Sequence, residues 1–217
     1  REQVQQMLDS GLLPKRGKVL DLCCGAGRHL LPMREVGLDA VGLDLSRDLL
    51  EHGQLQGVAV RGNAIALPFT DGVFDVVTNL FSSFGYFPTD AMHMQVLHEM
   101  RRVLKPGGKL IIDHMNAEVV IRDLVPYSEE VRGELTLKQT RRYDAESKRV
   151  IKDVEYCIAG KPNQHWHESV RLFSDVELNR FLVEAGFLLD GLYADLDCSK
   201  FDESSKRQLA VSRRPFP

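Results

Sequence analysis

The sequence predicts an α/β protein built on a doubly wound, mostly parallel sheet, with an antiparallel C-terminal hairpin and an inserted antiparallel β cover. From 18 to 113, short apolar runs alternate with longer helical patterns, which is typical of βαβ units. Between about 130 and 173, strict alternation of polar and apolar residues replaces helical spacing. The last apolar runs, at 187–194 and 207–212, are joined by a polar segment without room for a helical crossover, so they predict a hairpin.

The parallel part of the sheet is expected to contain five strands. Each is a short apolar run bounded by turn or helix signals. The expected strands lie near 18–22, 39–43, 57–61, 74–79 and 108–113.

Helix signals lie between these strands. Ser46 can cap a helix that runs to about His52, and a longer helix opens at 89–90 and reaches Leu104. The Lys-Pro-Gly-Gly sequence at 105–108 then ends the helix and turns the chain into the next strand.

The insertion is expected to form three antiparallel strands, with the first turn at 144–147. The sequence at 174–177 is a capping box that predicts a further helix, closed by Gly186. We therefore expect a single domain over 1–217, with the β-rich cover at about 130–173.

Composition narrows the class of protein. The chain has 217 residues and a net charge of −3, with 27% charged and 43% hydrophobic residues, as in a soluble globular domain with no electrostatic preference for nucleic acid. No apolar run approaches the roughly 20 residues that span a bilayer, and the start lacks a signal-peptide layout, so we expect a cytoplasmic protein without membrane contact. Because the chain begins at Arg1 rather than Met, a piece of N-terminus is expected to precede it.

Four cysteines, none with the paired spacing of a zinc site, indicate no metal centre. Two interpretations of the adjacent Cys23 and Cys24 are a redox pair and two small side chains that pack in a buried turn, and the sequence favours the packing interpretation.

The stretch 19–30 joins an apolar run, a small-residue turn and a helical pattern, which is typical of a nucleotide site. A dinucleotide loop needs a third glycine where Leu30 stands, and no P-loop lysine follows Gly27. A second apolar run ends in Asp44, which can accept both hydroxyls of a ribose. With dinucleotides and triphosphates disfavoured, the sequence indicates a ligand that has a ribose but does not need a phosphate.

With these motifs together, the chain resembles the class I S-adenosylmethionine-dependent methyltransferases of the small-molecule type. The resemblance implies a Rossmann-like, seven-stranded sheet and S-adenosyl-L-methionine as cofactor. The matching segments, in the family's order, are 19–27, 41–44, 62–64 with 67–69, 74–79 and 99–108.

Carried over residue by residue, the resemblance implies a cofactor site along this sheet edge. Asp21 and the backbone around Gly25 and Gly27 would hold the methionine end, and Asp44 would take the ribose hydroxyls. At the adenine, the resemblance implies Leu45 against the ring, with Asn63 and Ala64 at its amine side. Asn79 and Leu80 would lie beside the methionine. Arg28 either pairs with the cofactor carboxylate or faces solvent.

Two positions depart from the family pattern. Cys23 stands where the loop usually has its first glycine, and Asn63 replaces the usual acid. A thiol is small enough for a turn, and an amide oxygen still accepts a hydrogen bond, although more weakly than a carboxylate.

Methyl transfer is an in-line displacement, so the enzyme chiefly aligns donor and acceptor and removes a proton where the acceptor requires it. His114 ends a strand and is the candidate general base, against the alternative of a structural hydrogen-bonder. Tyr86 is a candidate for catalysis and substrate contact, because its phenol keeps a polar tip. Phe84 and Asn116 are further substrate candidates, Phe84 against the alternative of loop packing.

The cover supplies Arg141, Tyr143 and Trp166 as candidate substrate contacts. Alternation places Arg141 and Tyr143 on one face and Arg142 on the other. The expected partner is a small-molecule acceptor, an amine, hydroxyl or carbon acid, and the expected state is a monomer or homodimer. The alternatives are a cofactor-binding module without turnover and a nicotinamide-dependent oxidoreductase.

Overall fold

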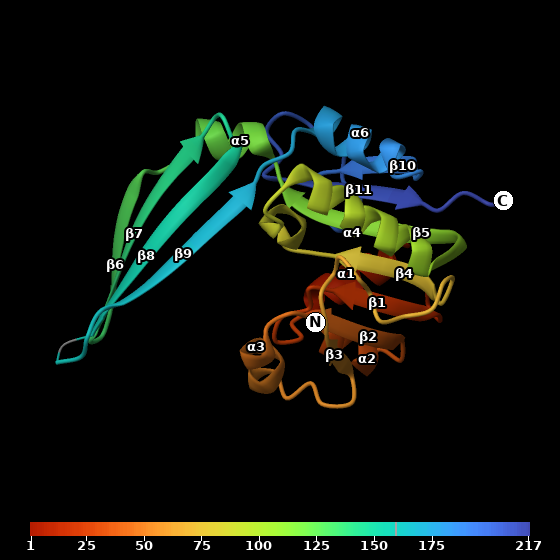
Figure 1. Cartoon of the computed structure of the whole chain (residues 1–217), viewed down its shortest axis with the longest axis horizontal. Helices are drawn as coiled ribbons and strands as arrows, with labels where there is room; N and C mark the ends of the chain where they lie inside the picture. Colours follow the sequence, from red (N-terminus) through yellow and green to blue (C-terminus); the bar gives the residue numbers. More distant parts are fainter. Residues whose placement is uncertain (159) are drawn as a thin grey trace.

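The computed structural model describes residues 1–158 and 160–217, and contains two separate sheets. Figure 1 shows an α/β body and, projecting from it, a second sheet joined near α5. The seven-stranded sheet has the order β10-β11-β5-β4-β1-β2-β3, in which only β11 runs antiparallel to its neighbours. Its strands are β1 (Lys18–Leu22), β2 (Asp39–Asp44), β3 (Ala59–Arg61), β4 (Phe74–Asn79), β5 (Leu104–Met115), β10 (Leu188–Tyr193) and β11 (Arg207–Arg213).

Helices cover both faces of this sheet, which confirms the doubly wound fold. Residues of α4 and α6 pack into one core cluster, and residues of α1 and α2 pack into the other. The helices are α1 (Glu2–Asp9), α2 (Leu30–Glu35), α3 (Arg47–His52), α4 (Asp90–Val103), α5 (Ala117–Arg122) and α6 (Asp175–Glu184), with a 3-10 turn η1 (Ser83–Tyr86).

The predicted helix starts are confirmed by their caps. Ser46 and Thr89 accept hydrogen bonds from the backbone N–H groups of Leu49 and Met92. Ser174 forms both halves of its capping box with Glu177. The short α1 and α5 lie outside the predicted elements.

The strand β5 begins at Leu104, four residues before the predicted start at 108. The Pro-Gly-Gly turn lies inside it, since Gly107 N–H donates to the Arg214 carbonyl and Arg214 N–H donates to Gly108. Gly107 has φ +77°, which only glycine adopts without strain. The helix α4 still ends at Val103, as the sequence predicts, and pairing with the C-terminal tail makes the turn residues part of β5.

The inserted sheet contains four strands, not three, and begins at 127 rather than about 130. Its order is β6-β7-β8-β9, all antiparallel. The strand that the sequence failed to predict is β6, whose sequence YSEEVR is polar and almost entirely exposed, so no alternation marks it. The strands are β6 (Tyr127–Arg132), β7 (Leu135–Asp144), β8 (Arg149–Ile158) and β9 (Gln164–Arg171).

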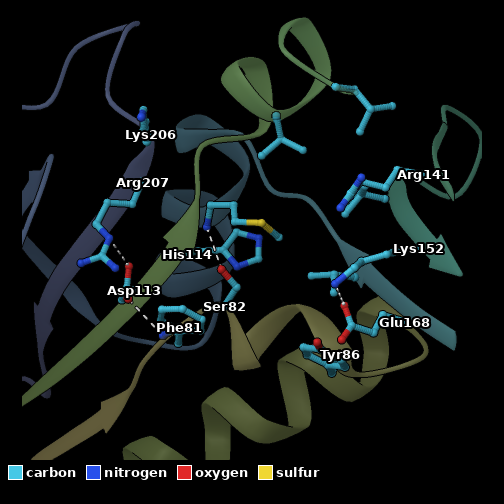
Figure 2. Close-up of a pocket in the computed structure, with 15 residues that line it drawn as sticks. Phe81, Ser82, Tyr86, Asp113, His114, Arg141, Lys152, Glu168, Lys206 and Arg207 are labelled. Atoms are coloured by element: carbon cyan, nitrogen blue, oxygen red, sulfur yellow. Dashed lines mark hydrogen bonds and ion pairs between the residues drawn. The ribbon is translucent and has the colours of Figure 1, made fainter. Parts of the chain in front are cut away.

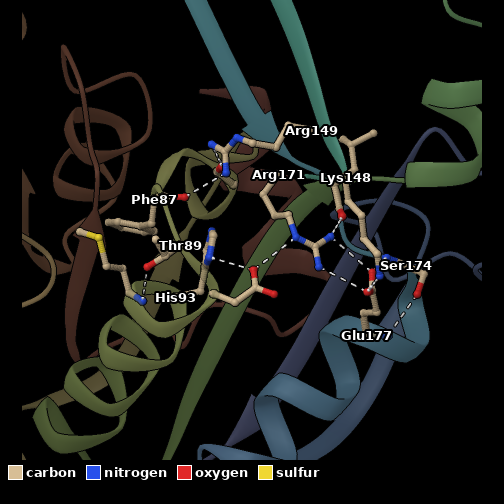
Figure 3. A network of polar contacts seen from close by, with 12 residues as sticks. Phe87, Thr89, His93, Lys148, Arg149, Arg171, Ser174 and Glu177 are labelled. Carbon is tan, nitrogen blue, oxygen red and sulfur yellow. Dashed lines mark hydrogen bonds and ion pairs between the residues drawn. The ribbon is translucent and has the colours of Figure 1, made fainter. Parts of the chain in front are cut away.

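Two arginines at the base of the cover join it to the α/β body (Figure 3). Arg149 donates to the carbonyl oxygens of Gly85 and Phe87, each at 3.2 Å. Arg171 is buried and lies 3.3 Å from both Asp90 and Glu177, acids in the first turns of α4 and α6. These charge-assisted contacts set the position of the cover over η1.

No helix in the described residues is long and apolar enough to cross a membrane.

Candidate active site

The glycine loop after β1 is built from left-handed backbone and tied to the end of β2. Cys23, Gly25 and Gly27 have φ values of +62°, +55° and +84°. Asp44 Oδ2 accepts the Gly25 N–H at 2.7 Å, and its Oδ1 accepts the Ser46 N–H at 2.8 Å. Because a carboxylate oxygen has two lone pairs, both oxygens can still accept a further hydrogen bond. Asp44 therefore holds the loop and can face a ligand as well.

Asp21 and Asn79 end neighbouring strands and carry unpartnered buried acceptors. Asp21 Oδ1 accepts the Thr78 hydroxyl at 3.1 Å, and Asn79 Nδ2 donates to the Leu22 carbonyl at 3.1 Å. Asp21 Oδ2 and Asn79 Oδ1 are buried and have no partner among the described residues. Burial raises the pKa of Asp21 to about 7. A cationic ligand group would pair with this carboxylate and remove the cost of its burial.

The structure supports the packing interpretation of the two cysteines. Burial raises the pKa of the Cys23 thiol to about 12 and that of Cys24 further, which opposes a reactive thiolate. Cys24 packs so closely on Gly42 that a Cβ there would lie 2.6 Å from its Sγ. Cys23, at φ +62°, occupies a conformation that favours glycine, which explains why the family has glycine at this position.

The other residues of the implied cofactor site differ in exposure. Leu45 is 62% exposed beside Asp44, an apolar side chain available to a flat ring. Asn63 is exposed and its Oδ1 accepts the Ile65 N–H at 3.2 Å. Ala64 and Leu80 are buried.

Arg28 is exposed, which agrees with the solvent-facing one of its two expected arrangements. Its guanidinium lies 4.6 Å from the centre of the Phe81 ring, which is the distance of a cation–π contact. Phe81 is 59% exposed and also lines a cavity, so this stack lies between the glycine loop and that cavity.

A cavity of about 590 Å³ lies between the carboxyl ends of β4 and β5 and the inserted sheet (Figure 2). Ligands of open α/β sheets bind at this edge. The cavity is lined by Phe81, Ser82, Tyr86, Asp113, His114, Met115, Val120, Leu124, Arg141, Val150, Lys152, Glu168, Val170, Lys206 and Arg207.

His114, Tyr86 and Arg141 are the predicted residues that the structure brings together here. His114 is fully buried, and neither ring nitrogen has a hydrogen-bond partner among the described residues. Burial lowers the pKa of His114 to about 4, so its imidazole is neutral at physiological pH. A neutral imidazole offers one donor and one acceptor to a ligand.

Four predicted substrate contacts lie elsewhere. Phe84 is fully buried against Phe173, with ring centres 5.4 Å apart, so it belongs to the core and not to the cavity surface. Asn116 caps α5 and donates to the Ser205 carbonyl. Tyr143 and Trp166 are absent from the cavity lining, and Trp166 is 58% exposed farther out on the cover.

Asp113 is a cavity residue that the sequence prediction missed. It is buried, and its Oδ2 accepts the Phe81 N–H at 3.0 Å while its carbonyl accepts the Ser82 N–H at 2.9 Å. Both residues of this turn are left-handed, with φ of +61° and +62°, a strained arrangement for residues with side chains. Asp113 also lies 3.3 Å from Arg207. The sequence could have indicated Asp113 as a site residue, because it is an acid at the end of a predicted strand and directly precedes His114.

Comparison with known proteins agrees with this geometry. Residues 19–108 match a family described as a methyltransferase domain. A demethylmenaquinone methyltransferase of Shouchella clausii is 43% identical over 103 residues, which are 42% of each chain. A protein of the same name from Corynebacterium kroppenstedtii is 29% identical over 192 residues, covering 86% of this chain and 73% of that protein. The chain thus matches only about two-fifths of the length of the first of these relatives.

Solved structures align over nearly the whole length of this chain. The CcbJ methyltransferase of Streptomyces caelestis superposes with a TM-score of 0.87 at 20% identity, over 99% of this chain and 90% of that one. The S-adenosylmethionine-bound CalS10, an amino pentose methyltransferase of Micromonospora echinaspora, has a TM-score of 0.70 at 20% identity, over 98% and 89%.

The doubly wound, mostly parallel seven-stranded sheet is Rossmann-like. The match to the methyltransferase-domain family covers residues 19–108, less than half of the chain, and the solved structures show that the chain shares its fold with methyltransferases.

Proposed function

We propose that this chain is an S-adenosylmethionine-dependent methyltransferase that acts on a small molecule bound in the cavity under the cover. The observation that carries the proposal is a buried carboxylate oxygen of Asp21 that has no hydrogen-bond partner among residues 1–158 and 160–217. It lies beside the left-handed loop and at the same sheet edge as the cavity. The names of the relatives support a small-molecule acceptor.

The residues present fit the cofactor. Asp21 would hold its ammonium group, because a cation satisfies a buried carboxylate. Asp44 would accept the ribose hydroxyls with its remaining lone pairs, and the exposed Leu45 would cover the adenine. When bound, the cofactor supplies an electrophilic methyl group on a sulfonium centre.

The cavity residues would orient the acceptor and handle its proton. Tyr86 is half exposed at the cavity wall, so its phenol can hydrogen-bond an amine or hydroxyl directly. Both His114 ring nitrogens are buried and lack a partner among the described residues, so the imidazole would reach the acceptor only once a side chain of the cavity wall moves aside. The low pKa of His114 makes it a weak base, suited to acceptors whose proton becomes acidic as the new bond forms. Asp113 would act as a positioning residue that holds Phe81 and Ser82 at the cavity wall.

Calorimetry combined with a transfer assay tests this proposal. We expect the protein to bind S-adenosylmethionine or S-adenosylhomocysteine and to ignore NADH, and to transfer labelled methyl groups into a metabolite extract. Binding of NADH instead would indicate an oxidoreductase. Cofactor affinity without transfer to any acceptor in a broad panel would indicate a binding module without turnover.

A further inference from the structure

The cavity roof carries a cross-strand row of three charged side chains. Arg141 on β7 lies directly opposite Lys152 on β8, and Lys152 lies directly opposite Glu168 on β9. All three line the cavity (Figure 2). Residues directly opposite on neighbouring strands point to the same side of a sheet, so the row faces the ligand space as a unit.

The row contains a like-charge pair that the fold alone does not favour. Like charges directly opposite each other in a sheet are destabilising. Lys152 Nζ lies 3.6 Å from Glu168 Oε2, which neutralises part of the row. Arg141 is half-buried and donates only to the neutral Ser128 Oγ and Gln139 Oε1, with no carboxylate partner among the described residues. The row therefore keeps one formal positive charge.

The other cations of the cavity are differently placed. Arg207 lies 3.3 Å from Asp113 and 2.8 Å from Asp195, so its charge is balanced. Lys206 is exposed and lies across the cavity from Arg141 (Figure 2). Between the charged row and His114 the lining is largely apolar, with Met115, Val120, Leu124, Val150 and Val170. Apolar side chains thus separate the charged row on the cover from the polar groups at the sheet edge, where Lys206 is the other cation without a carboxylate partner among the described residues.

We propose that Arg141 and Lys152 form a carboxylate-binding subsite for the methyl acceptor. The acceptor would have an apolar body, one carboxylate under the cover and its methyl-accepting atom toward Tyr86 and His114. A single negative charge matches the row, and the planar guanidinium of Arg141 can bind both carboxylate oxygens. This inference rests on the proposed function, because it names the acceptor class for that same cavity.

Calorimetry with matched probes tests the subsite. The protein, with and without saturating S-adenosylhomocysteine, is titrated with 3-phenylpropionate, with the neutral 3-phenylpropanamide and with 2-phenylethyl phosphate. We expect the carboxylate to bind at least about tenfold tighter than the amide and tighter than the phosphate ester. Arg141→Gln should abolish this preference and Lys152→Gln should reduce it. Arg142→Gln is the matched control, since Arg142 is the exposed next residue of β7, and should keep it.

Several results would overturn the subsite. They are equal binding of acid and amide, no binding of either, a preference for the phosphate ester, or a carboxylate preference that survives both Arg141→Gln and Lys152→Gln. S-adenosylhomocysteine binding without a carboxylate preference removes the subsite and leaves the methyltransferase proposal standing. Failure of S-adenosylhomocysteine to bind removes the methyltransferase proposal, while the titrations without it still test the subsite.

Discussion

The proposed cofactor end and the proposed acceptor end of this protein are built in different ways. The cofactor end consists of a loop and two strand ends, and its key acid Asp44 contacts residues of adjoining turns. The acceptor end is assembled from a separate sheet whose strand register places Arg141, Lys152 and Glu168 in one row. The cofactor end therefore depends on local backbone geometry, and the acceptor end depends on how the inserted sheet packs over the seven-stranded sheet.

The largest expected effect is at the cofactor end. Asp44→Ala removes the acceptor for two backbone N–H groups as well as the expected ribose contact. Hydrogen bonds to a charged group contribute about 1.5–3 kcal/mol each, so we expect calorimetry to show cofactor affinity reduced by about 100-fold or more. Asp48→Ala, in the exposed first turn of α3, is the control and should bind normally. Unchanged affinity in Asp44→Ala would refute its assigned role.

The second effect concerns the buried Asp21. Its folded-state pKa of about 7 exceeds its unfolded value of 3.8, so the folded state holds the proton more tightly and loses stability as pH rises from about 4 to 7. Asp21→Asn avoids this loss and should raise the free energy of unfolding of the ligand-free protein at pH 8 by about 1–4 kcal/mol. Urea titrations at pH 5 and pH 8 measure the change.

The same substitution should weaken cofactor binding, because the neutral amide no longer pairs with a cation. Wild-type affinity should rise with pH up to about 7 and then level, as Asp21 ionises. Asp39→Asn, at an exposed position, is the matched control for both measurements. A less stable Asp21→Asn protein at pH 8 would contradict this account.

The third effect separates the two ends. Arg149→Ala removes the hydrogen bonds from the cover to Gly85 and Phe87. We expect about a tenfold rise in KM for the acceptor, with the cofactor Kd unchanged, because hydrogen bonds from a charged donor contribute about 1.5–3 kcal/mol each. Steady-state kinetics and calorimetry measure the two values, with Arg142→Ala as control. Equal losses at both ends would show that the cover and the loop act as one unit.

The smallest effect is at Cys23. Cys23→Gly relieves left-handed strain, but it increases the freedom of the unfolded chain and removes a side chain packed against the core, so we expect a change of no more than about 0.5 kcal/mol by urea denaturation. Cys24→Gly should instead destabilise the protein, because it removes a side chain packed against Gly42. The reverse order of these two results would contradict the interpretation of the loop.

The parts of the fold that were predictable share a local origin. Ser46, Thr89 and Ser174 cap their helices through side-chain contacts three residues along the chain, as expected. The unpredicted β6 is a strand only because β7 pairs with it, and its polar sequence carries no pattern of its own. Phe84 was misassigned because an aromatic residue after a strand fits a core as well as a pocket.

The sequence by itself determined the parallel α/β frame, the small-residue loop and the acids at the ends of β1 and β2, because strand, cap and turn preferences act over a few residues. Only the tertiary structure decided which side chains share the cavity. Asp113 reaches Phe81 across 32 positions of chain, and Arg141 meets Lys152 through strand register. Such contacts depend on pairing between segments that are far apart in the sequence. No local sequence pattern predicts which of these segments will pair.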